Sequence, residues 1–317
     1  MNKQQCLYCY QPLVDQPGDY HEKCSKKLFG MAVPPVLPFD ETQIAELAKE
    51  VVRSQLALTG VQAKLSLDIV PKEGTATHKR FTIVGLWGQY ILKPPSDYYQ
   101  SLPELEDLTM HLAALSDVAT VPHGLIRLGN SLAYITKRVD RVKGVKLPME
   151  DMCQLTERLT EDKYRGSYEQ IAKAILKHSQ NPGLDVINLY EQVVFSYLTG
   201  NADMHLKNFS LIKANSTGHV LCPAYDMVAT ALVVPDDKEE LALTLNARKN
   251  KIVRDDFVKA MERGGVSSKA IDNIFDKFSQ YIKLWQPFIE KSFIPEKMKG
   301  QYWELVEKRA RHIGVMV

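Results

Sequence analysis

The sequence is poor in cysteine and has no long apolar run. Only five of its 317 residues are Cys, which is too few for a scaffold built on disulfides. No apolar stretch approaches the roughly 18 residues that a membrane helix needs, and the polar start MNKQQ lacks the apolar segment of a secretory signal. These absences argue against a disulfide-rich secreted domain and against a membrane protein, and we expect a cytoplasmic location.

The chain also lacks a strong excess of either charge. Forty Lys and Arg stand against 38 Asp and Glu, which gives a formal net charge of +2. A protein held to nucleic acid by neutralising phosphates usually carries a larger positive excess, so we expect no direct DNA contact. With 45% hydrophobic and 25% charged residues, the chain can bury a core, and its length allows two or three domains of about 100–200 residues.

Four regions follow from the pattern along the chain. Residues 1–30 hold three of the Cys and few branched aliphatic side chains, which predicts a small separate module. Residues 31–57 contain the proline-rich AVPPVLPF and then helical spacing with Asp40 as N-cap, so they form a linker and a leading helix. Residues 58–148 form a small lobe, and residues 149–317 form a helical lobe.

The small lobe has short segments rich in β-branched and aromatic residues: LSLDIV, FTIVG, YILK, GLIRL and LAYITK. They predict an antiparallel sheet, interrupted by one helix over SLPELEDLTMHLAAL. After Pro148 the periodicity is mainly helical, with Ser267 as an N-cap and Gly300 as a weak point. The fold class is therefore α+β.

Cys6, Cys9, His21 and Cys24 form the pattern C-x2-C-x11-H-x2-C. Three thiolates and one imidazole make a closed tetrahedral ligand set, which predicts a structural zinc ion in a zinc-ribbon-like module. The alternatives are a redox-active C-x-x-C pair or unrelated surface thiols. No βαβ pattern surrounds the pair, which argues against the redox alternative, and the complete ligand set leaves no open position for catalytic zinc.

The strongest chemical signal is GNADMHLKNFSLI, which follows a long apolar helical pattern. Asp203 and Asn208 stand in the D-x4-N spacing of phosphotransferase catalytic loops, where the Asp meets the substrate hydroxyl and the Asn binds magnesium. Asp226, in PAYDMVA after an expected strand VLCPAY, supplies a second acidic metal ligand. A D-x4-N pair alone is also compatible with a turn Asp and an N-capping Asn.

Upstream segments offer groups that contact phosphates. Lys93 ends the strand YILK and can reach ATP phosphates, with Glu106 in the next helix placed to pair with it. The alternative without a functional role is a solvent-facing Lys beside a surface Glu. In LTGVQAKLSL, Gly60 permits a tight turn whose amides face a phosphate, and Gln62 and Lys64 add donors. No Walker A or G-x-G-x-x-G motif is present.

The ordered series TGVQAKLSL, YILKPP, ELEDLTMHLA, ITKRVDR, KLPMEDMCQ, GNADMHLKNFSLI and AYDMVA resembles the HipA family of serine/threonine kinases, the toxins of bacterial toxin–antitoxin pairs. The resemblance runs from about Leu58 to Ile289. It implies a bilobal fold distantly similar to protein kinases, with a small β-rich lobe, a larger all-helical lobe and ATP in the cleft between them.

The resemblance also implies roles for individual residues. Asp203 becomes the catalytic Asp, Lys207 steadies the γ-phosphate, and His205 is either electrostatic or structural. Asn208 and Asp226 become magnesium ligands. The ATP-binding set is Gly60, Gln62, Lys64, Lys93, Glu106 and, at the hinge near adenine, Lys137, Arg138 and Val139.

Two features depart from the family pattern. The S-x-S-G segment, in which family members phosphorylate themselves, has Ala57 and Thr59 here, so Thr59 is the predicted autophosphorylation site and Ser54 a weaker one. Only about 57 residues precede the phosphate loop, where full-length members carry a further β-rich subdomain. We therefore expect the short, split form, with a separate small HipS-like subunit.

The function implied by the resemblance is an ATP- and magnesium-dependent serine/threonine protein kinase that inhibits translation. Aminoacyl-tRNA synthetases are among the family's known substrates. The implied partner is a HipB-like helix-turn-helix antitoxin, through which contact with DNA would be indirect. Two alternatives stay open: a small-molecule kinase, and a catalytically inactive scaffold that binds the antitoxin.

Overall fold

The computed structural model describes residues 4–14, 17–54, 63–72, 79–85, 87–142, 144–215, 218–234 and 238–316. The chain divides into two compact units. Unit 1 contains Met1–Asp107, Val121–Val145 and Lys291–Phe293, and unit 2 contains Leu108–Thr120, Lys146–Glu290 and Ile294–Val317. Both units combine helices with strands, as the predicted α+β class requires.

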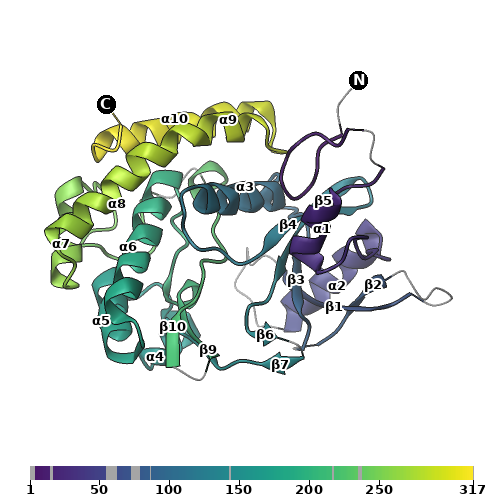
Figure 1. Cartoon of the computed structure of the whole chain (residues 1–317), viewed down its shortest axis with the longest axis horizontal. Helices are drawn as coiled ribbons and strands as arrows, with labels where there is room; N and C mark the ends of the chain where they lie inside the picture. Colours follow the sequence, from purple (N-terminus) through teal and green to yellow (C-terminus); the bar gives the residue numbers. More distant parts are fainter. Residues whose placement is uncertain are drawn as a thin grey trace. The chain divides into compact units, whose positions relative to one another are not determined.

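A five-stranded antiparallel sheet lies at the centre of unit 1 (Figure 1). The strand order is β2-β1-β3-β5-β4. The strands are β1 (Leu65–Pro71), β2 (Lys79–Ile83), β3 (Tyr90–Lys93), β4 (His123–Leu128) and β5 (Ser131–Lys137). In β1, Leu65 and Leu67 are buried and Ser66 between them is not, which is the alternation of a strand with one covered face. Each strand overlaps a segment predicted as a strand, so the prediction of a small antiparallel sheet is confirmed.

Helix α2 (Glu41–Ser54) is the leading helix that the sequence predicts. Asp40 caps it, because its Oδ1 accepts a hydrogen bond from the Gln43 N–H at 2.8 Å. The Gln43 side chain accepts one in return from the Asp40 N–H at 3.0 Å, which completes a capping box. Ile44, on the apolar face, is fully buried.

Helix α1 (Glu22–Phe29) packs on the sheet of unit 1 through aromatic side chains. The Phe29 ring centroid lies 5.9 Å from that of Phe81 and 6.2 Å from that of Tyr90, on β2 and β3 respectively. Such edge and tilted contacts bury large apolar areas and favour one arrangement of the rings. Helix α3 (Leu102–Leu115), also predicted from the sequence, begins in unit 1 and ends in unit 2.

Unit 2 is mainly helical and contains a small sheet. Its helices are α4 (Met152–Leu155), α5 (Tyr168–His178), α6 (Pro182–Thr199), α7 (Arg254–Arg263), α8 (Ser268–Tyr281), α9 (Trp285–Glu290) and α10 (Glu296–His312). Its sheet has the order β10-β9-β8, from β8 (Met149–Asp151), β9 (Ser210–Asn215) and β10 (Gly218–Leu221). A two-stranded sheet, which lies in unit 1 except for Lys146, joins β6 (Arg141–Val142) to β7 (Val145–Lys146). The second half is thus mainly helical, as predicted, but not wholly helical.

Two details of unit 2 differ from the sequence prediction, and proline explains both. The strand expected over VLCPAY ends at Leu221, because Pro223 has no N–H to continue the ladder. The long helical pattern from Ser267 divides into α8, a 3-10 turn and α9. Pro287 lies in the first turn of α9, where its missing N–H is tolerated, whereas a continuous helix would place its ring against the carbonyl of Lys283. Ser267 caps α8 as predicted.

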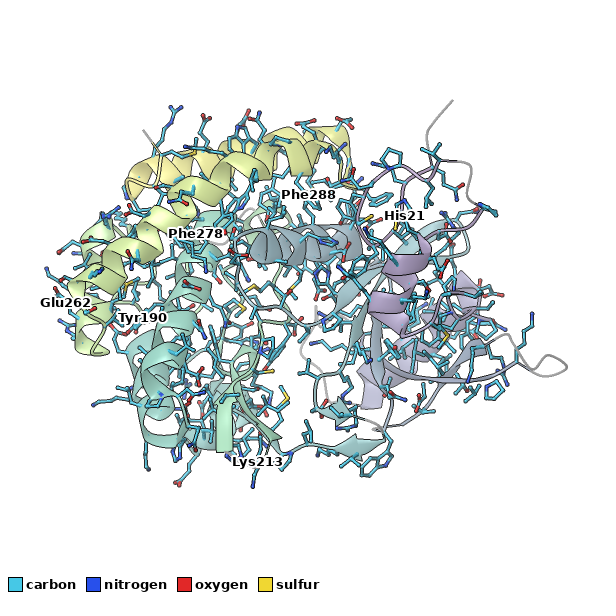
Figure 2. All side chains as sticks on the ribbon, in the orientation of Figure 1. His21, Tyr190, Lys213, Glu262, Phe278 and Phe288 are labelled. Atoms are coloured by element: carbon cyan, nitrogen blue, oxygen red, sulfur yellow. The ribbon has the colours of Figure 1, made fainter. Side chains whose placement is uncertain are left out.

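The core of unit 2 lies among its helices. Phe278 and Tyr190 are fully buried, whereas Glu262 and Lys213 are exposed (Figure 2). Trp285 is the largest fully buried side chain in the described part of the chain. Its indole N–H donates a hydrogen bond to the Ser116 hydroxyl at 2.9 Å, so its only polar atom is satisfied.

Across the described ranges, we find no helix that combines the length and the apolar character needed to cross a bilayer.

Candidate active site and candidate metal centre

The loop with the D-x4-N spacing begins where α6 ends. Gly200 terminates the helix with a φ of 74°, a left-handed conformation that glycine adopts without a Cβ penalty. The Thr230 hydroxyl then accepts a hydrogen bond from the Ala202 N–H at 2.9 Å and donates one to the Gly200 carbonyl at 3.2 Å. The loop is therefore attached at its start to a buried helix and to a neighbouring turn.

Hydrogen bonds inside the loop hold Asp203 and Asn208 in a defined arrangement. The Asn208 side-chain N–H donates to the Asp203 carbonyl at 2.9 Å, and the Asn201 side-chain oxygen accepts from the Asp203 N–H at 3.1 Å. The side-chain nitrogen of Asn208 is thus bonded to a backbone carbonyl, and its side-chain oxygen is the group able to bind a cation. The structure brings the two residues together, as the spacing predicts.

The Asp203 carboxylate can meet a hydroxyl group. Its side chain is 41% exposed, and one of its oxygens accepts a hydrogen bond from the Tyr164 hydroxyl at 2.5 Å. A carboxylate that is partly exposed, hydrogen-bonded to a hydroxyl and carried on a backbone held by hydrogen bonds can orient or deprotonate an alcohol. No sequence motif pointed to Tyr164, because it lies 39 residues before Asp203.

His205 lies beside Asp203 but is buried. Its Nε2 is 4.0 Å from an Asp203 oxygen, and its side chain is 6% exposed. Burial lowers the pKa of His205, and the nearby Lys163 lowers it further, although the carboxylates of Asp203 and Asp226 act in the opposite direction. Burial thus disfavours the charged imidazole, which favours the structural role over the electrostatic one.

Lys207 is paired with a residue from another motif. Its Nζ lies 2.7 Å from an Asp151 oxygen. The strand pairing of β8 with β9 sets Asp151 opposite Ser210, so the motifs LPMEDMCQ and GNADMHLKNFS are neighbours in one sheet. Sequence reasoning missed Asp151, although it lies inside a quoted motif, because strand register cannot be read from spacing.

Asp226 has an unusual backbone conformation. Its φ is 60°, in the left-handed region that costs a non-glycine residue roughly 1–2 kcal/mol. The segment is held by a hydrogen bond from the Ala224 N–H to the Ala119 carbonyl at 2.7 Å. A strained residue that persists in a rigid setting often belongs to a functional site.

In unit 1, Lys93 and Glu106 form the ion pair that the sequence predicts. The Lys93 Nζ lies 2.5 Å from a Glu106 oxygen, and both side chains are almost completely buried. The Nζ also lies 5.3 Å from the centre of the Tyr134 ring, a cation–π contact. A buried, paired Lys at the end of a strand contradicts the alternative of a solvent-facing Lys, while its role toward ATP stays a prediction.

The other predicted ATP contacts are placed only in part. Gly60, Gln62 and the predicted autophosphorylation site Thr59 lie outside the described residues. Lys64 directly precedes β1. At the expected hinge, Lys137 ends β5 and its backbone N–H donates a hydrogen bond to the Pro122 carbonyl at 2.8 Å. The backbone N–H of Arg138 donates one to the Gln89 carbonyl, also at 2.8 Å. The adenine contact expected at Lys137, Arg138 and Val139 stays a prediction.

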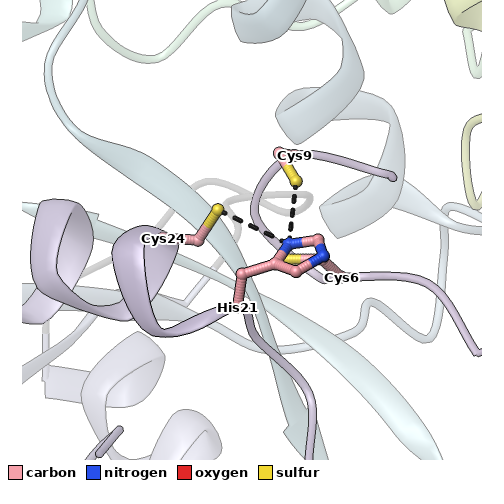
Figure 3. Close-up of side chains that lie close together, drawn as sticks. All are labelled: Cys6, Cys9, His21 and Cys24. Atoms are coloured by element: carbon pink, nitrogen blue, oxygen red, sulfur yellow. Dashed lines mark hydrogen bonds between the residues drawn. The ribbon is translucent and has the colours of Figure 1, made fainter. Parts of the chain in front are cut away.

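Cys6, Cys9, His21 and Cys24 come together in unit 1 (Figure 3). Their ligand atoms all lie within 4.8 Å of one another. The His21 Nδ1 is 3.4 Å from the Cys9 sulfur and 3.8 Å from the Cys24 sulfur. A tetrahedral zinc ion with ordinary bond lengths would place a sulfur and a nitrogen ligand about 3.6 Å apart. The four side chains therefore fit the geometry of a zinc site.

The outer contacts of this cluster also suit a metal. The His21 Nε2 lies 3.2 Å from the Pro12 carbonyl, so a proton on Nε2 leaves Nδ1 free to bind a cation. All five cysteines are free, which excludes a disulfide between Cys6 and Cys9 in this structure. Burial raises the pKa of the Cys9 and Cys24 thiols, and a bound cation would oppose this effect.

A family model described as "HipA-like C-terminal domain" matches residues 56–285. The chain belongs to this family. A Haemophilus influenzae protein named "Putative kinase" is 29% identical to this HipA-like chain over 293 residues, which cover 83% of the chain and 82% of that protein. A Sinorhizobium fredii protein named "Putative kinase Y4dM" is 30% identical over 282 residues, covering 83% of the chain and 66% of that protein.

Solved structures show the same fold. HipA from Shewanella oneidensis MR-1, solved with HipB and operator DNA as a toxin–antitoxin system, matches with a TM-score of 0.68 at 20% identity. That match covers 84% of this HipA-like chain and 71% of the Shewanella chain. The Helicobacter pylori proinflammatory kinase CtkA matches with a TM-score of 0.51 at 17% identity, covering 78% and 94%. The predicted family and the predicted HipA-like fold are confirmed.

Proposed function

We propose that this HipA-like chain is an ATP-dependent serine/threonine protein kinase. The observation that carries the proposal is the state of Asp203, a partly exposed carboxylate that already accepts a hydrogen bond from a hydroxyl group, that of Tyr164. A serine or threonine hydroxyl in the same place would be aligned for phosphoryl transfer. Membership in a family whose curated relatives carry the name kinase supports the same chemistry.

In this mechanism the Asp203 carboxylate orients the substrate hydroxyl and takes its proton. The hydroxyl oxygen bonds to the γ-phosphorus while the bond from that phosphorus to the β–γ bridging oxygen breaks, and ADP leaves. Lys93, held by Glu106, contacts the ATP phosphates. Lys207 serves the γ-phosphate only if it exchanges its contact with Asp151 for one with the nucleotide.

The donor set suits magnesium. The side-chain oxygen of Asn208 and the carboxylate of Asp226 are hard oxygen ligands of the kind that Mg²⁺ prefers. When bound, the ion neutralises charge on the phosphates. The chain's part is to present these oxygens from a loop and a turn whose backbones are held by hydrogen bonds.

For the biological role, we propose the toxin of a bacterial toxin–antitoxin pair. The Shewanella protein was solved with HipB and its operator DNA, which supports a HipB-like antitoxin partner here and indirect contact with DNA. A cytosolic protein is the proposed target, with aminoacyl-tRNA synthetases as the first candidates. Mass spectrometry of proteins phosphorylated on induction of this chain would name the target, and it would separate protein from small-molecule substrates.

The proposal is tested with Asp203→Asn and Asp226→Asn, each compared with Asp255→Asn. Asp255 is an exposed carboxylate on α7 that pairs with Lys259, so its loss should be silent. We expect Asp203→Asn to lose at least about 100-fold in transfer of labelled γ-phosphate to protein, the usual effect of removing a catalytic acid–base group. Asp226→Asn should lose transfer as well, because it replaces a carboxylate ligand of magnesium with a neutral amide. Normal transfer by a folded Asp203→Asn variant would contradict the proposed mechanism.

A further inference from the structure

The described part of the Cys/His module, residues 4–14 and 17–30, is fixed against the edge strand β4 of unit 1. The Leu125 N–H donates to the Leu7 carbonyl at 3.1 Å, and the Arg127 guanidinium makes a two-pronged contact with the Asp19 carboxylate. A Cβ at Gly124 would lie 2.9 Å from the Leu28 side chain, so the two surfaces are in close contact there. The module is therefore positioned as part of the lobe that carries Lys93.

Tyr10 extends from the metal-ligand turn into the interior of unit 1. It directly follows Cys9, its N–H donates to the Cys6 carbonyl at 2.9 Å, and its φ is 61°. The side chain is fully buried, and its hydroxyl donates to the Asp107 carboxylate at 2.7 Å. Its ring also meets the edge of Phe293 at a centroid distance of 4.9 Å. The turn that would hold the metal thus places the Tyr10 hydroxyl on the Asp107 carboxylate of α3.

Asp107 directly follows Glu106 on α3, so consecutive residues make this contact and the ion pair with Lys93. The second Asp107 oxygen lies 2.6 Å from the His123 Nδ1 on β4. The His123 ring stacks on Tyr134 at 6.0 Å, and the Tyr134 ring lies under the Lys93 Nζ. Buried contacts therefore connect Tyr10 to Lys93 and Glu106 along both α3 and the sheet.

We propose that one Zn²⁺ bound by Cys6, Cys9, His21 and Cys24 sets the ATP affinity of the chain through Tyr10. The ion folds a segment too short to have a sufficient core of its own. The folded turn holds Tyr10 on Asp107, which fixes the first turns of α3 and keeps Glu106 on Lys93. Tyr10 is a positioning residue, and the inference rests on the proposed role of Lys93 in ATP binding.

The test uses the full-length chain and two matched tyrosine variants. Tyr10→Phe removes the hydroxyl that reaches Asp107, whereas Tyr20→Phe removes a hydroxyl of the same module that donates to the Leu125 carbonyl of β4. Zinc content is measured by elemental analysis, and the Kd for ATP with magnesium by calorimetry. We expect one zinc per chain in both variants, a five- to tenfold weaker ATP affinity in Tyr10→Phe, and an unchanged affinity in Tyr20→Phe.

Removal of the metal completes the test. A zinc-selective chelator, added with excess magnesium, should weaken ATP binding to the unmodified chain. Its effect on Tyr10→Phe should be clearly smaller, because that variant already lacks the hydrogen bond to Asp107 through which zinc acts. Cys24→Ser should bind less than one zinc per chain. A chain that holds no zinc, or one whose ATP affinity is the same with and without zinc, would overturn the inference.

Lys93→Met separates this inference from the proposed function. If Lys93→Met weakens ATP binding but Tyr10→Phe does not, the kinase proposal stands and the coupling through Tyr10 is wrong. If Lys93→Met leaves ATP binding unchanged, the proposed role of Lys93 is wrong, whatever the zinc content of the chain.

Discussion

His205 shows how burial decides the chemistry of a single side chain. The residue is 5% exposed, and its ring makes an edge contact with Tyr164 at a centroid distance of 4.9 Å. Among the described residues, its Nδ1 has no hydrogen-bond partner. A charged imidazole in such a place would lack solvation, which is why its pKa is lowered. The residue supports the loop as a neutral ring.

This lowered pKa predicts a loss of stability in mild acid. Below the ordinary histidine pKa of about 6.5, His205 is protonated more readily in the unfolded chain than in the folded one. The free energy of unfolding therefore falls as the pH falls. Denaturant unfolding at pH 7.5 and pH 5.5 would measure this. The decrease should be smaller in His205→Gln, and an equal decrease in both proteins would show that His205 does not contribute.

The C-terminal end of α6 determines where the catalytic loop starts. Besides its φ of 74°, Gly200 faces two side chains: a Cβ there would lie 2.6 Å from Leu305 and 3.0 Å from Ala231. Gly300, inside α10, is the opposite case, because a Cβ there would meet nothing within 4 Å. The end of α6 thus requires a glycine at position 200, whereas α10 has room for a Cβ at position 300.

Substitution by alanine should therefore have opposite effects at the two glycines. Gly200→Ala should lower the free energy of unfolding by at least about 1–2 kcal/mol, from the left-handed backbone alone. Gly300→Ala should raise it by about 0.5–1 kcal/mol, because alanine loses less backbone entropy in a helix. Denaturant unfolding of both variants measures the difference. Equal effects in the two variants would contradict this account of the α6 end.

The proposed ATP contacts and the proposed catalytic loop belong to different units of the chain. Lys93 and Glu106 lie in unit 1, while Asp203, Asn208 and Asp226 lie in unit 2. The chain as a whole is then required for the proposed reaction, because neither unit contains the full set.

ATP with magnesium should therefore stabilise the intact chain against heat. A ligand at 100 times its Kd adds about 2.7 kcal/mol to the free energy of unfolding. The Tm should rise more with magnesium than without it, and Asp226→Asn should lose the magnesium-dependent part. Magnesium should be omitted rather than chelated, since a general chelator would also take zinc. No rise in Tm under either condition would favour the inactive scaffold.

Much of the fold was predictable because its signals are local. The five strands of unit 1 follow from β-branched and aromatic runs, and the caps at Asp40 and Ser267 follow from side chains that bond their own helix ends. The division of the long helical pattern by the 3-10 turn Ile282–Leu284, just before Pro287, was missed, because the periodicity of apolar residues continues across it. The proline itself was the signal that could have shown it.

For the candidate site, the sequence alone determined the types and spacings of the chemical groups: the D-x4-N loop, Lys93 at the end of a strand with Glu106 in the next helix, and the four Cys/His ligands. Only the tertiary structure decided their partners and states. Lys207 pairs with Asp151 across 56 residues, and Tyr10 meets Asp107 across 97. Burial lowers the pKa of His205 and so disfavours its charged form. Spacing along a chain reports local geometry, whereas strand register, burial and desolvation depend on segments that are distant in the sequence.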